Sequence, residues 1–328
     1  MQQPPRHVFS VVAALLLPIA AAPSAGAQDY PAKQVTFVLP FTPGGAIDLC
    51  ARFLAQQLTD RLGKPFVVEN RPGAGTVVAS NLVAKAAPDG YTILVAPSPL
   101  ATNATLHKQL PYDPAKDFAP IARVTDIPFV LVVHPSLPVR TVPELIQYAR
   151  ERPGQLSYAS SGSGSTLHLA GELFKSMTGI EMTHVPYRGS PPALNDVVAG
   201  HVNLMFADPA SAVAQIREGR VRPLGVTSLT RIPTAPDIPP IAEAGLPGFE
   251  AVSWTLLVAP AATPPAIVNK LHAELKSVVA SPEGQRQIIG FGMLPFDSPP
   301  PEELKTFLQA EILRWGKVVQ QAGIAGSE

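Results

Sequence analysis

The stretch FVLPFTPGGAIDLCARFLAQQL, residues 37–58, runs from an apolar segment through a Thr-Pro-Gly-Gly turn directly into a helical pattern. A strand, a glycine turn and the start of a helix in this order leave backbone N–H groups free to bind an anion. Gly44 and Gly45 allow the main chain to approach a ligand closely, and Pro43 stiffens the turn. The stretch therefore predicts a strand–turn–helix unit with an anion-binding turn.

The same order of elements occurs in both halves of the chain. In each half a strand leads through a glycine loop into a helix, and two further strands follow with a helix between them. The predicted strands are residues 35–41, 65–70, 91–96, 156–160, 181–187 and 202–207. Strands that alternate with helices predict an α/β fold of mostly parallel sheets, with ligands beyond the carboxyl ends of the strands.

A chain of 328 residues favours two lobes over one globule. The late strand SWTLLVAP and the apolar stripe of the helix at 300–322 indicate that the chain returns to the first lobe. We expect it to cross between lobes near residues 122–130 and 248–256, with a cleft between the lobes. The expected division is lobe I at 28–124 and 252–328 and lobe II at 125–251.

The N-terminus has the features of a cleavable secretory signal, residues 1–27. Arg6 precedes the apolar run 8–22, which ends near the small residues before Gln28. A retained membrane anchor is the alternative, but the run is short for a bilayer and contains Pro18. We therefore expect cleavage after Ala27 and a periplasmic mature protein.

The composition excludes several classes of function. Lys+Arg and Asp+Glu both number 25, so no overall charge attracts nucleic acid or an anionic membrane. The chain lacks the phosphate-binding G-x-x-x-x-G-K-[ST] and the nucleophile elbow G-x-S-x-G, and its histidines have no metal-ligand spacing. We therefore expect a monomer that is not an enzyme and has no cofactor, no metal site and no nucleic-acid partner.

The second glycine loop, SSGSGST at 160–166, offers hydroxyl groups as well as backbone N–H groups. Neither glycine loop contains Lys or Arg, so a bound carboxylate would be held by N–H and O–H donors, each contributing about 1.5–3 kcal/mol. Arg71 and Arg188 follow the second strand of each half and could either reach the ligand or brace the lobes.

Three further side chains have two interpretations each. Asp48 lies in the first turn of its helix, where capping is favoured over ligand contact. Asp208, at a strand end, could meet a ligand ammonium or amide, or cap the next helix. His168 opens a helix and could face the cleft. With Ser163 or Ser165 it could serve a hydrolase or transferase, but no recognisable motif supplies an acid to orient it.

The mature chain also resembles a known family over its whole length. The segments YPAKQVTFVLPFTPGGAIDLCARFLAQQL, VVENRPGAG, AKAAPDGYTILV, LPYDPAKDFAPIARV and GSGSTLHLAGELFKSMTGIEMTHVPYRGSPPALNDVVAG closely resemble the Bug family. These proteins are the periplasmic solute-binding components of tripartite tricarboxylate transporters. The resemblance implies a two-lobed periplasmic-binding-protein type 2 fold that closes on a small carboxylate or related solute and delivers it to membrane transporter subunits.

The resemblance also implies a set of ligand-binding residues in loops of both lobes. They are Phe41, Thr42, Gly44, Gly45, Ala46 and Asp48, then Pro97 and Ser98, then Ser161, Gly162, Ser163, Gly164, Ser165 and Thr166, and finally Ala207 and Asp208. His168 joins them from its position at the start of the second helix. We expect a β-branched residue at Gly45 or Gly164 to abolish binding and leave the fold nearly intact.

Two departures from the family pattern concern the ligand. Ala46-Ile47 stands where many relatives have a small or hydroxylated pair, and Ala207 stands where many have Asp directly after the strand. A solute-binding sensor for a membrane receptor would need the same loops, so transport and sensing both remain open at this point.

Overall fold

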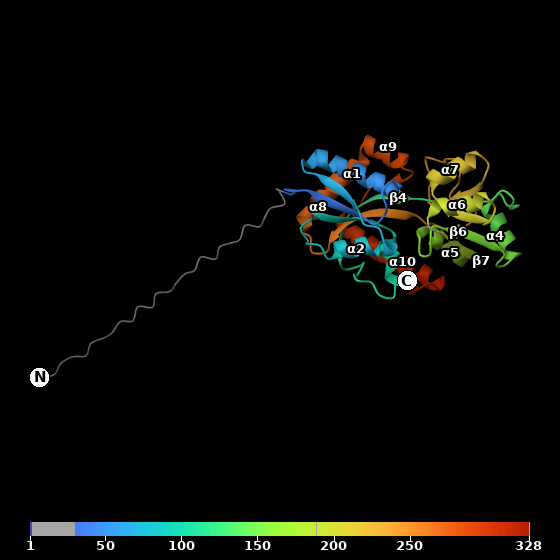
Figure 1. The fold of residues 1–328 in the computed structure, drawn as a ribbon, viewed down its shortest axis with the longest axis horizontal. Coiled ribbons are helices and arrows are strands. Elements are labelled where there is room, and N and C mark those ends of the chain that lie inside the picture. The colour runs from blue at the N-terminus through green and yellow to red at the C-terminus, as the bar shows by residue number, and fades with distance from the viewer. Residues whose placement is uncertain (2–29, 188, 328) are drawn as a thin grey trace.

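The computed structural model describes Met1 and residues 30–187 and 189–327, arranged as two α/β lobes side by side (Figure 1). Apart from Met1, the predicted signal peptide lies outside the described residues. Within the described part of the chain, no helix has the length and apolar character needed to cross a membrane.

Lobe I is built on a six-stranded sheet with the order β11-β4-β10-β3-β1-β2. Its strands are β1 Val35–Leu39, β2 Phe66–Asn70, β3 Thr92–Pro97, β4 Phe118–Ile127, β10 Ser253–Pro260 and β11 Leu294–Pro295. β1 pairs in parallel with β2 and β3, whereas β10 is antiparallel to both β3 and β4. The helices of this lobe are α1 Ala46–Leu62, α2 Val77–Ala84, α3 Pro99–Leu106, α8 Pro265–Ala280, α9 Pro282–Gly290 and α10 Pro301–Gln321, with a short 3₁₀ turn at Ala74–Thr76.

Lobe II repeats this topology with a five-stranded sheet of order β7-β6-β8-β5-β9. Its strands are β5 Val130–Val133, β6 Leu156–Ser160, β7 Met182–Pro186, β8 Leu204–Ala207 and β9 Arg222–Val226. The helices are α4 Val142–Arg150, α5 Thr166–Thr178, α6 Ser190–Val198 and α7 Pro209–Arg217. β5 is antiparallel to β8 and β9, so both sheets are mixed.

In lobe I, β10 and the edge strand β11 run against the other strands, and in lobe II β5 is antiparallel to both of its neighbours. The reversal of β10 and β5 has a topological cause. β5 enters lobe II directly from β4, and β10 enters lobe I from lobe II. A strand that arrives from the other lobe lacks the helical crossover that keeps βαβ neighbours parallel. β4 remains in the first sheet as far as Ile127. We therefore propose that the lobes divide near residues 127 and 252, close to the expected boundaries.

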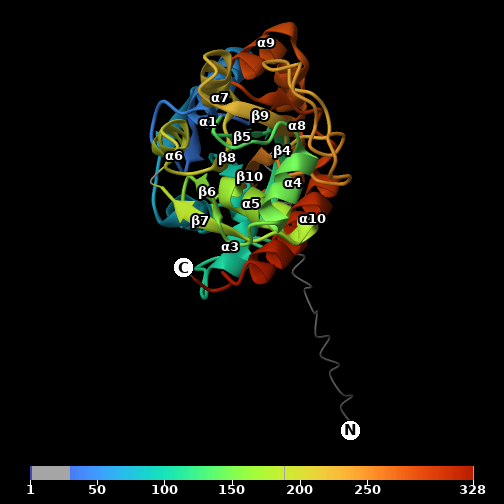
Figure 2. The same ribbon diagram turned by 90° about the vertical axis from the view of Figure 1, so that its right-hand side faces the viewer.

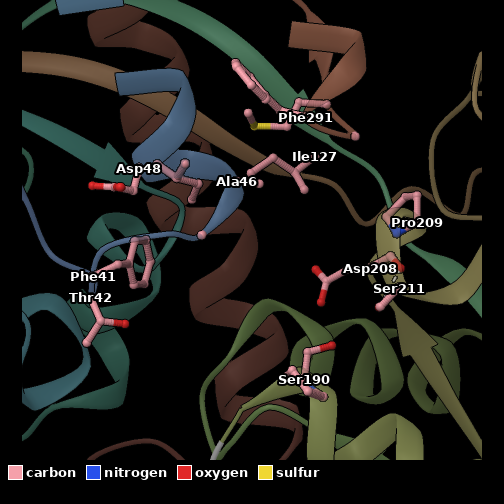
Figure 3. A pocket seen from close by; sticks show the side chains of 15 residues that line it. Phe41, Thr42, Ala46, Asp48, Ile127, Ser190, Asp208, Pro209, Ser211 and Phe291 are labelled. Carbon is pink, nitrogen blue, oxygen red and sulfur yellow. Dashed lines mark hydrogen bonds between the residues drawn. The ribbon is translucent and has the colours of Figure 1, made fainter. Parts of the chain in front are cut away.

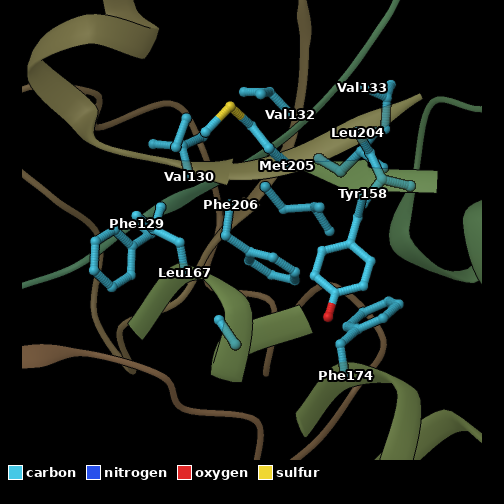
Figure 4. Packing of buried hydrophobic residues seen from close by; sticks show 14 of the residues in the cluster. Phe129, Val130, Val132, Val133, Tyr158, Leu167, Phe174, Leu204, Met205 and Phe206 are labelled. Atoms are coloured by element: carbon cyan, nitrogen blue, oxygen red, sulfur yellow. The ribbon is translucent and has the colours of Figure 1, made fainter. Parts of the chain in front are cut away.

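Each sheet is covered by its own hydrophobic core. In lobe II, β5, β6 and β8 bury Val130, Tyr158 and Phe206 against Phe174 of α5 (Figure 4). Lobe I has a core on each face of its sheet. Because alternate strand residues point to opposite faces, Phe37 belongs to one of these cores and Val38 to the other.

Helix α10 belongs to both lobes. Its first half buries Leu304 and Leu308 in a lobe I core, whereas Trp315 and Val319 are buried in the lobe II core. The helix lies against α3 and α5 and occupies the lower edge of the molecule in Figure 1 and in Figure 2. The apolar stripe expected from the sequence is therefore present, but it packs on two cores rather than one.

Candidate ligand-binding cleft

Two cavities lie between the lobes. The first cavity has a volume of about 490 Å³, which is in the range of small-molecule sites. It is lined by Phe41, Thr42, Gly45, Ala46, Ile47, Asp48, Ile127, Ser190, Pro191, Asp208, Pro209, Ser211, Phe291, Gly292 and Met293. Figure 3 shows these side chains converging from the turn before α1, from the end of β4 and from lobe II.

The turn before α1 is held in place by Asp48. The Asp48 carboxylate accepts the Gly44 N–H at 3.0 Å, the Arg52 guanidinium at 3.0 Å and the Asn70 side-chain amide at 2.9 Å. Burial acts to raise the pKa of Asp48, but the hydrogen bonds from Arg52, Asn70 and Gly44 outweigh it and lower the pKa. In Figure 3 the carboxylate points away from the cavity. Both carboxylate oxygens of Asp48 therefore accept hydrogen bonds from the protein, in line with the capping interpretation.

This turn leaves backbone donors for a ligand. Within the described residues, the N–H groups of Gly45, Ala46 and Ile47 have no hydrogen-bond partner. Gly44 has a φ of +94°, which a residue with a side chain rarely adopts. The first turn of α1 thus offers several N–H groups and the positive end of the helix dipole to an anion.

The glycine-serine loop lines a second cavity instead. This cavity, of about 460 Å³, is bounded by Pro40, Phe41, residues 73–76, Pro99, Asn103, Leu106, residues 161–165 and Gly189. Phe41 lines both cavities. The two glycine loops, expected to form halves of one carboxylate site, therefore face different cavities that share the Phe41 side chain.

Much of the glycine-serine loop is hydrogen-bonded internally. Gly162 N–H donates to Ser160 Oγ at 3.1 Å, and Gly164 N–H donates to His168 Nδ1 at 3.0 Å. Ser165 Oγ donates to Gly162 O at 2.7 Å and caps α5. In the described chain, the N–H groups of Ser161 and Ser163 are left without a partner and could meet a ligand.

His168 lies behind this loop and lines neither cavity. It is 3 % exposed and stacks on His184, with ring centroids 3.7 Å apart. Burial, with smaller effects from His184 and Lys175, lowers the pKa of His168 to about 3. Its Nδ1 already accepts the Gly164 N–H, and no hydrogen bond joins its ring to Ser163 or Ser165 among the described contacts. The serine–histidine arrangement of the hydrolase alternative is not formed.

Five other expected ligand contacts also lie outside the two cavity linings, namely Gly44, Pro97, Ser98, Thr166 and Ala207. Pro97 and Ala207 are buried at the ends of their strands, where they pair with Thr255 and Val130 of the neighbouring strands. Ser98 Oγ is 2.9 Å from Thr166 Oγ1 and 2.7 Å from Ser253 Oγ. Ser98 and Thr166 therefore hydrogen-bond one lobe to the other rather than facing a ligand cavity.

Asp208 does line the first cavity. Its side chain makes no capping bond to α7, and Ser211 Oγ instead donates to the Asp208 main-chain carbonyl at 3.0 Å. Figure 3 shows the carboxylate pointing into the cavity above Ser190. Burial raises the pKa of Asp208, and the nearby Ser190 hydroxyl offsets part of the rise. The carboxylate itself is thus free to contact a ligand.

Sequence reasoning missed the apolar wall of the first cavity. Ile127 comes from the end of β4, and Phe291 and Met293 come from the turn between α9 and β11. Their only sequence signal is ordinary hydrophobicity, because their position depends on how the lobes sit together. Arg71, one of the two cations considered, is paired with Glu69, and Arg188 lies outside the described residues.

Comparisons with known proteins agree on one family. The family described as "Tripartite tricarboxylate transporter family receptor" matches residues 50–324. Protein BugT of Bordetella pertussis is 36 % identical over 318 residues, which cover 96 % of this chain and 95 % of BugT. This sequence identity, over nearly the whole length of both chains, and the match to the family over most of this chain show that they share a family.

Two solved structures show the same fold with carboxylates. The R. palustris protein Rpa4515 with adipate has a TM-score of 0.79 and 42 % identity, covering 90 % of this chain and 99 % of that one. MatC from Rhodopseudomonas palustris with bound malate has a TM-score of 0.74 and 35 % identity, covering 88 % of this chain and 100 % of that one. The two-lobed fold expected from the sequence is confirmed.

Proposed function

This chain belongs to the Bug family of TctC-type solute-binding proteins, the receptors of tripartite tricarboxylate transporters, and on that basis we propose that it captures a small carboxylate in the periplasm. The acid binds between the lobes in the first cavity and is released unchanged to membrane transporter subunits. The related proteins solved with adipate and malate support a carboxylate as the ligand.

The observation that carries this proposal is the start of α1 at the wall of the first cavity. Gly45, Ala46 and Ile47 present N–H groups without partners in the described structure, beside a cavity of about 490 Å³. Three charge-assisted hydrogen bonds of about 1.5–3 kcal/mol each supply about 4.5–9 kcal/mol, so micromolar binding at about 8 kcal/mol also needs burial of the ligand's apolar surface. The apolar wall of Ile127, Phe291 and Met293 suits a ligand with a hydrocarbon body.

The chemistry of the site also supports binding without turnover. The buried His168 ring is occupied by the Gly164 N–H, and the Asp48 carboxylate is occupied by Arg52, Asn70 and Gly44. Neither group is available as a general base for a ligand in the first cavity. Recovery of every bound acid unchanged after incubation with the purified protein is the expected result, and conversion of any acid would refute this part of the proposal.

A thermal-shift panel of monocarboxylates, dicarboxylates, amino acids and aromatic acids tests the binding proposal with the mature chain from Gln28. Ligand binding to the native state adds RT ln(1 + [L]/Kd) to stability, so about 2.7 kcal/mol is expected at a hundredfold excess over Kd. The acid that raises Tm most is then measured by calorimetry. A panel in which no acid raises Tm, although the protein melts cooperatively, would refute the proposal.

Delivery to a transporter needs a separate test. Membrane vesicles that contain the cognate transporter subunits should take up the labelled acid only when the loaded protein is added. Uptake that is equal with and without the protein would argue against delivery and leave binding intact.

A further inference from the structure

The first cavity contains a carboxyl group without a charged partner among the described residues. Of the charged side chains that line it, Asp48 is paired with Arg52, whereas Asp208 forms no salt bridge with any described residue. Neither Lys nor Arg is among the described residues that line it. A ligand that enters this cavity therefore meets one carboxylate that no described cation neutralises, although Arg188 lies outside the described residues.

A second polar group beside Asp208 is also unsatisfied. Ser190 Oγ is buried and makes no hydrogen bond of normal geometry to any described residue. A buried hydroxyl without a partner costs about 1–3 kcal/mol, so such groups usually meet a ligand or a water. In Figure 3, Ser190 and Asp208 lie together at the lobe II side of the cavity.

The opposite side of the cavity offers hydrogen-bond donors instead of an acceptor. There the first turn of α1 presents only donors, from Gly45 to Ile47, and these suit a carboxylate. The apolar side chains of Phe41, Ile127 and Phe291 also line the cavity, and Figure 3 shows Ile127 between Ala46 and Asp208. The cavity is therefore polarised, with hydrogen-bond donors at the α1 end and an acceptor at the Asp208 end.

We propose that Asp208, with Ser190 beside it, selects a ligand whose far end carries a nitrogen-bearing hydrogen-bond donor, an ammonium or a primary amide. This inference rests on the proposed function, since the acid end of the same ligand binds at α1. A second carboxylate at the far end would face Asp208 across a partly desolvated cavity, where like charges repel strongly. Dicarboxylates of the kind bound by the two related proteins are therefore disfavoured here.

The test uses ligands that differ only at the far end. Calorimetry at pH 8 compares straight-chain dicarboxylates of four to six carbons with two analogues of each. One analogue is the monoamide, and the other is the amino acid of equal length whose amino group replaces the far carboxylate. In the native protein the monoamide or the amino acid should bind at least tenfold more tightly than the dicarboxylate. In Asp208→Asn the preference should fall to within about threefold or reverse, because the asparagine amide can donate to a carboxylate.

A matched control is Glu181→Gln, which removes an exposed carboxylate of the same lobe that lines neither cavity. This variant should keep the native preference, and both variants should melt within a few degrees of the native protein. A native preference for the dicarboxylate, or a preference that Asp208→Asn leaves unchanged, would overturn the inference while the proposed function stands. Failure of all these ligands to bind either protein would count against the proposed function and the inference together.

Discussion

At the scale of single residues, the two glycine loops differ in how they tolerate a side chain. A Cβ on Gly45 would meet no atom within 4 Å, and the φ of Gly45 is −78°, which any residue adopts. At Gly164 the φ is +71° and a Cβ would lie 2.2 Å from Leu106 Cδ2 of the other lobe. The expectation that both substitutions leave the fold intact therefore has to be restricted to Gly45.

Gly45→Val should abolish acid binding with little loss of stability. The valine side chain would project beside the free N–H groups of α1, and its cost as an N-cap is about 1 kcal/mol. Calorimetry with the best acid of the panel should give no heat, while the urea midpoint stays close to native. Gly290→Val is the control. A Cβ at Gly290 would also meet no atom within 4 Å, and Gly290 lines neither cavity. Normal acid binding by Gly45→Val would mean that the acid lies elsewhere.

A second residue-scale prediction concerns His168, which is buried under the glycine-serine loop, and the half-buried His184 stacked on it. Burial lowers the pKa of His168 to about 3 and that of His184 to about 4, so both are neutral in the folded protein at pH 7. Below the unfolded pKa of 6.5, the unfolded chain binds more protons and stability falls as pH decreases. At pH 5 the loss at His168 alone is about 2 kcal/mol.

Urea unfolding between pH 8 and pH 5 measures this dependence. His168→Asn keeps an oxygen that can accept the Gly164 N–H but has no proton to gain in this range. The variant should show a clearly shallower fall in unfolding free energy than the native protein. If the unfolding free energy of the two proteins falls equally between pH 8 and pH 5, then His168 is already protonated in the folded state or does not govern the loss of stability in acid.

At the scale of elements, helix α10 depends on one buried carboxylate. Glu311 Oε2 accepts the indole N–H of Trp254 at 2.8 Å and that of Trp315 at 2.9 Å. Trp254 belongs to a lobe I core and Trp315 to the lobe II core. Glu311 thus joins β10 to α10 at the place where the chain passes from one lobe to the other.

Glu311→Ala should destabilise the whole protein by at least about 2 kcal/mol. It leaves two buried indole N–H groups without an acceptor, each costing about 1–3 kcal/mol, and opens a cavity in addition. Urea denaturation followed by tryptophan fluorescence measures the loss. Gln309→Ala, at an exposed position of the same helix, should change stability by less than about 0.5 kcal/mol. A similar small effect at Glu311 would contradict the role assigned to it.

The elements also show what the sequence can predict. Hydrophobic periodicity and glycine stops located the repeated strand–helix order, because these signals depend only on neighbouring residues. The reversed direction of β5 and β10 could not be predicted, since a buried strand has the same composition in either direction. The turn before α1 could be predicted because its glycines are a local signal. Ile127 and Phe291 could not be assigned to the site, because they reach it only through the packing of distant segments.

At the scale of the whole molecule, the two lobes are connected in three ways. The chain crosses from β4 to β5 and again into β10, α10 spans both cores, and Ser98 hydrogen-bonds to Thr166 across the lobes. Within the described residues, no hydrogen bond or salt bridge joins Asp208 or Ile47, which both line the first cavity, to the opposite lobe. This asymmetry favours a hinge that closes the cleft from the Asp208 side.

Small-angle scattering with and without the best acid of the panel tests closure. A compact domain of about 300 residues has a radius of gyration of about 19 Å, and a saturating acid should reduce the measured value if the lobes close on it. Gly45→Val mixed with the same acid should keep the unliganded value, because closure is driven by the bonds that the acid forms with both lobes. An unchanged radius for the native protein, at acid concentrations that calorimetry shows to be saturating, would mean that the cleft is already closed without ligand and that the hinge does not report binding.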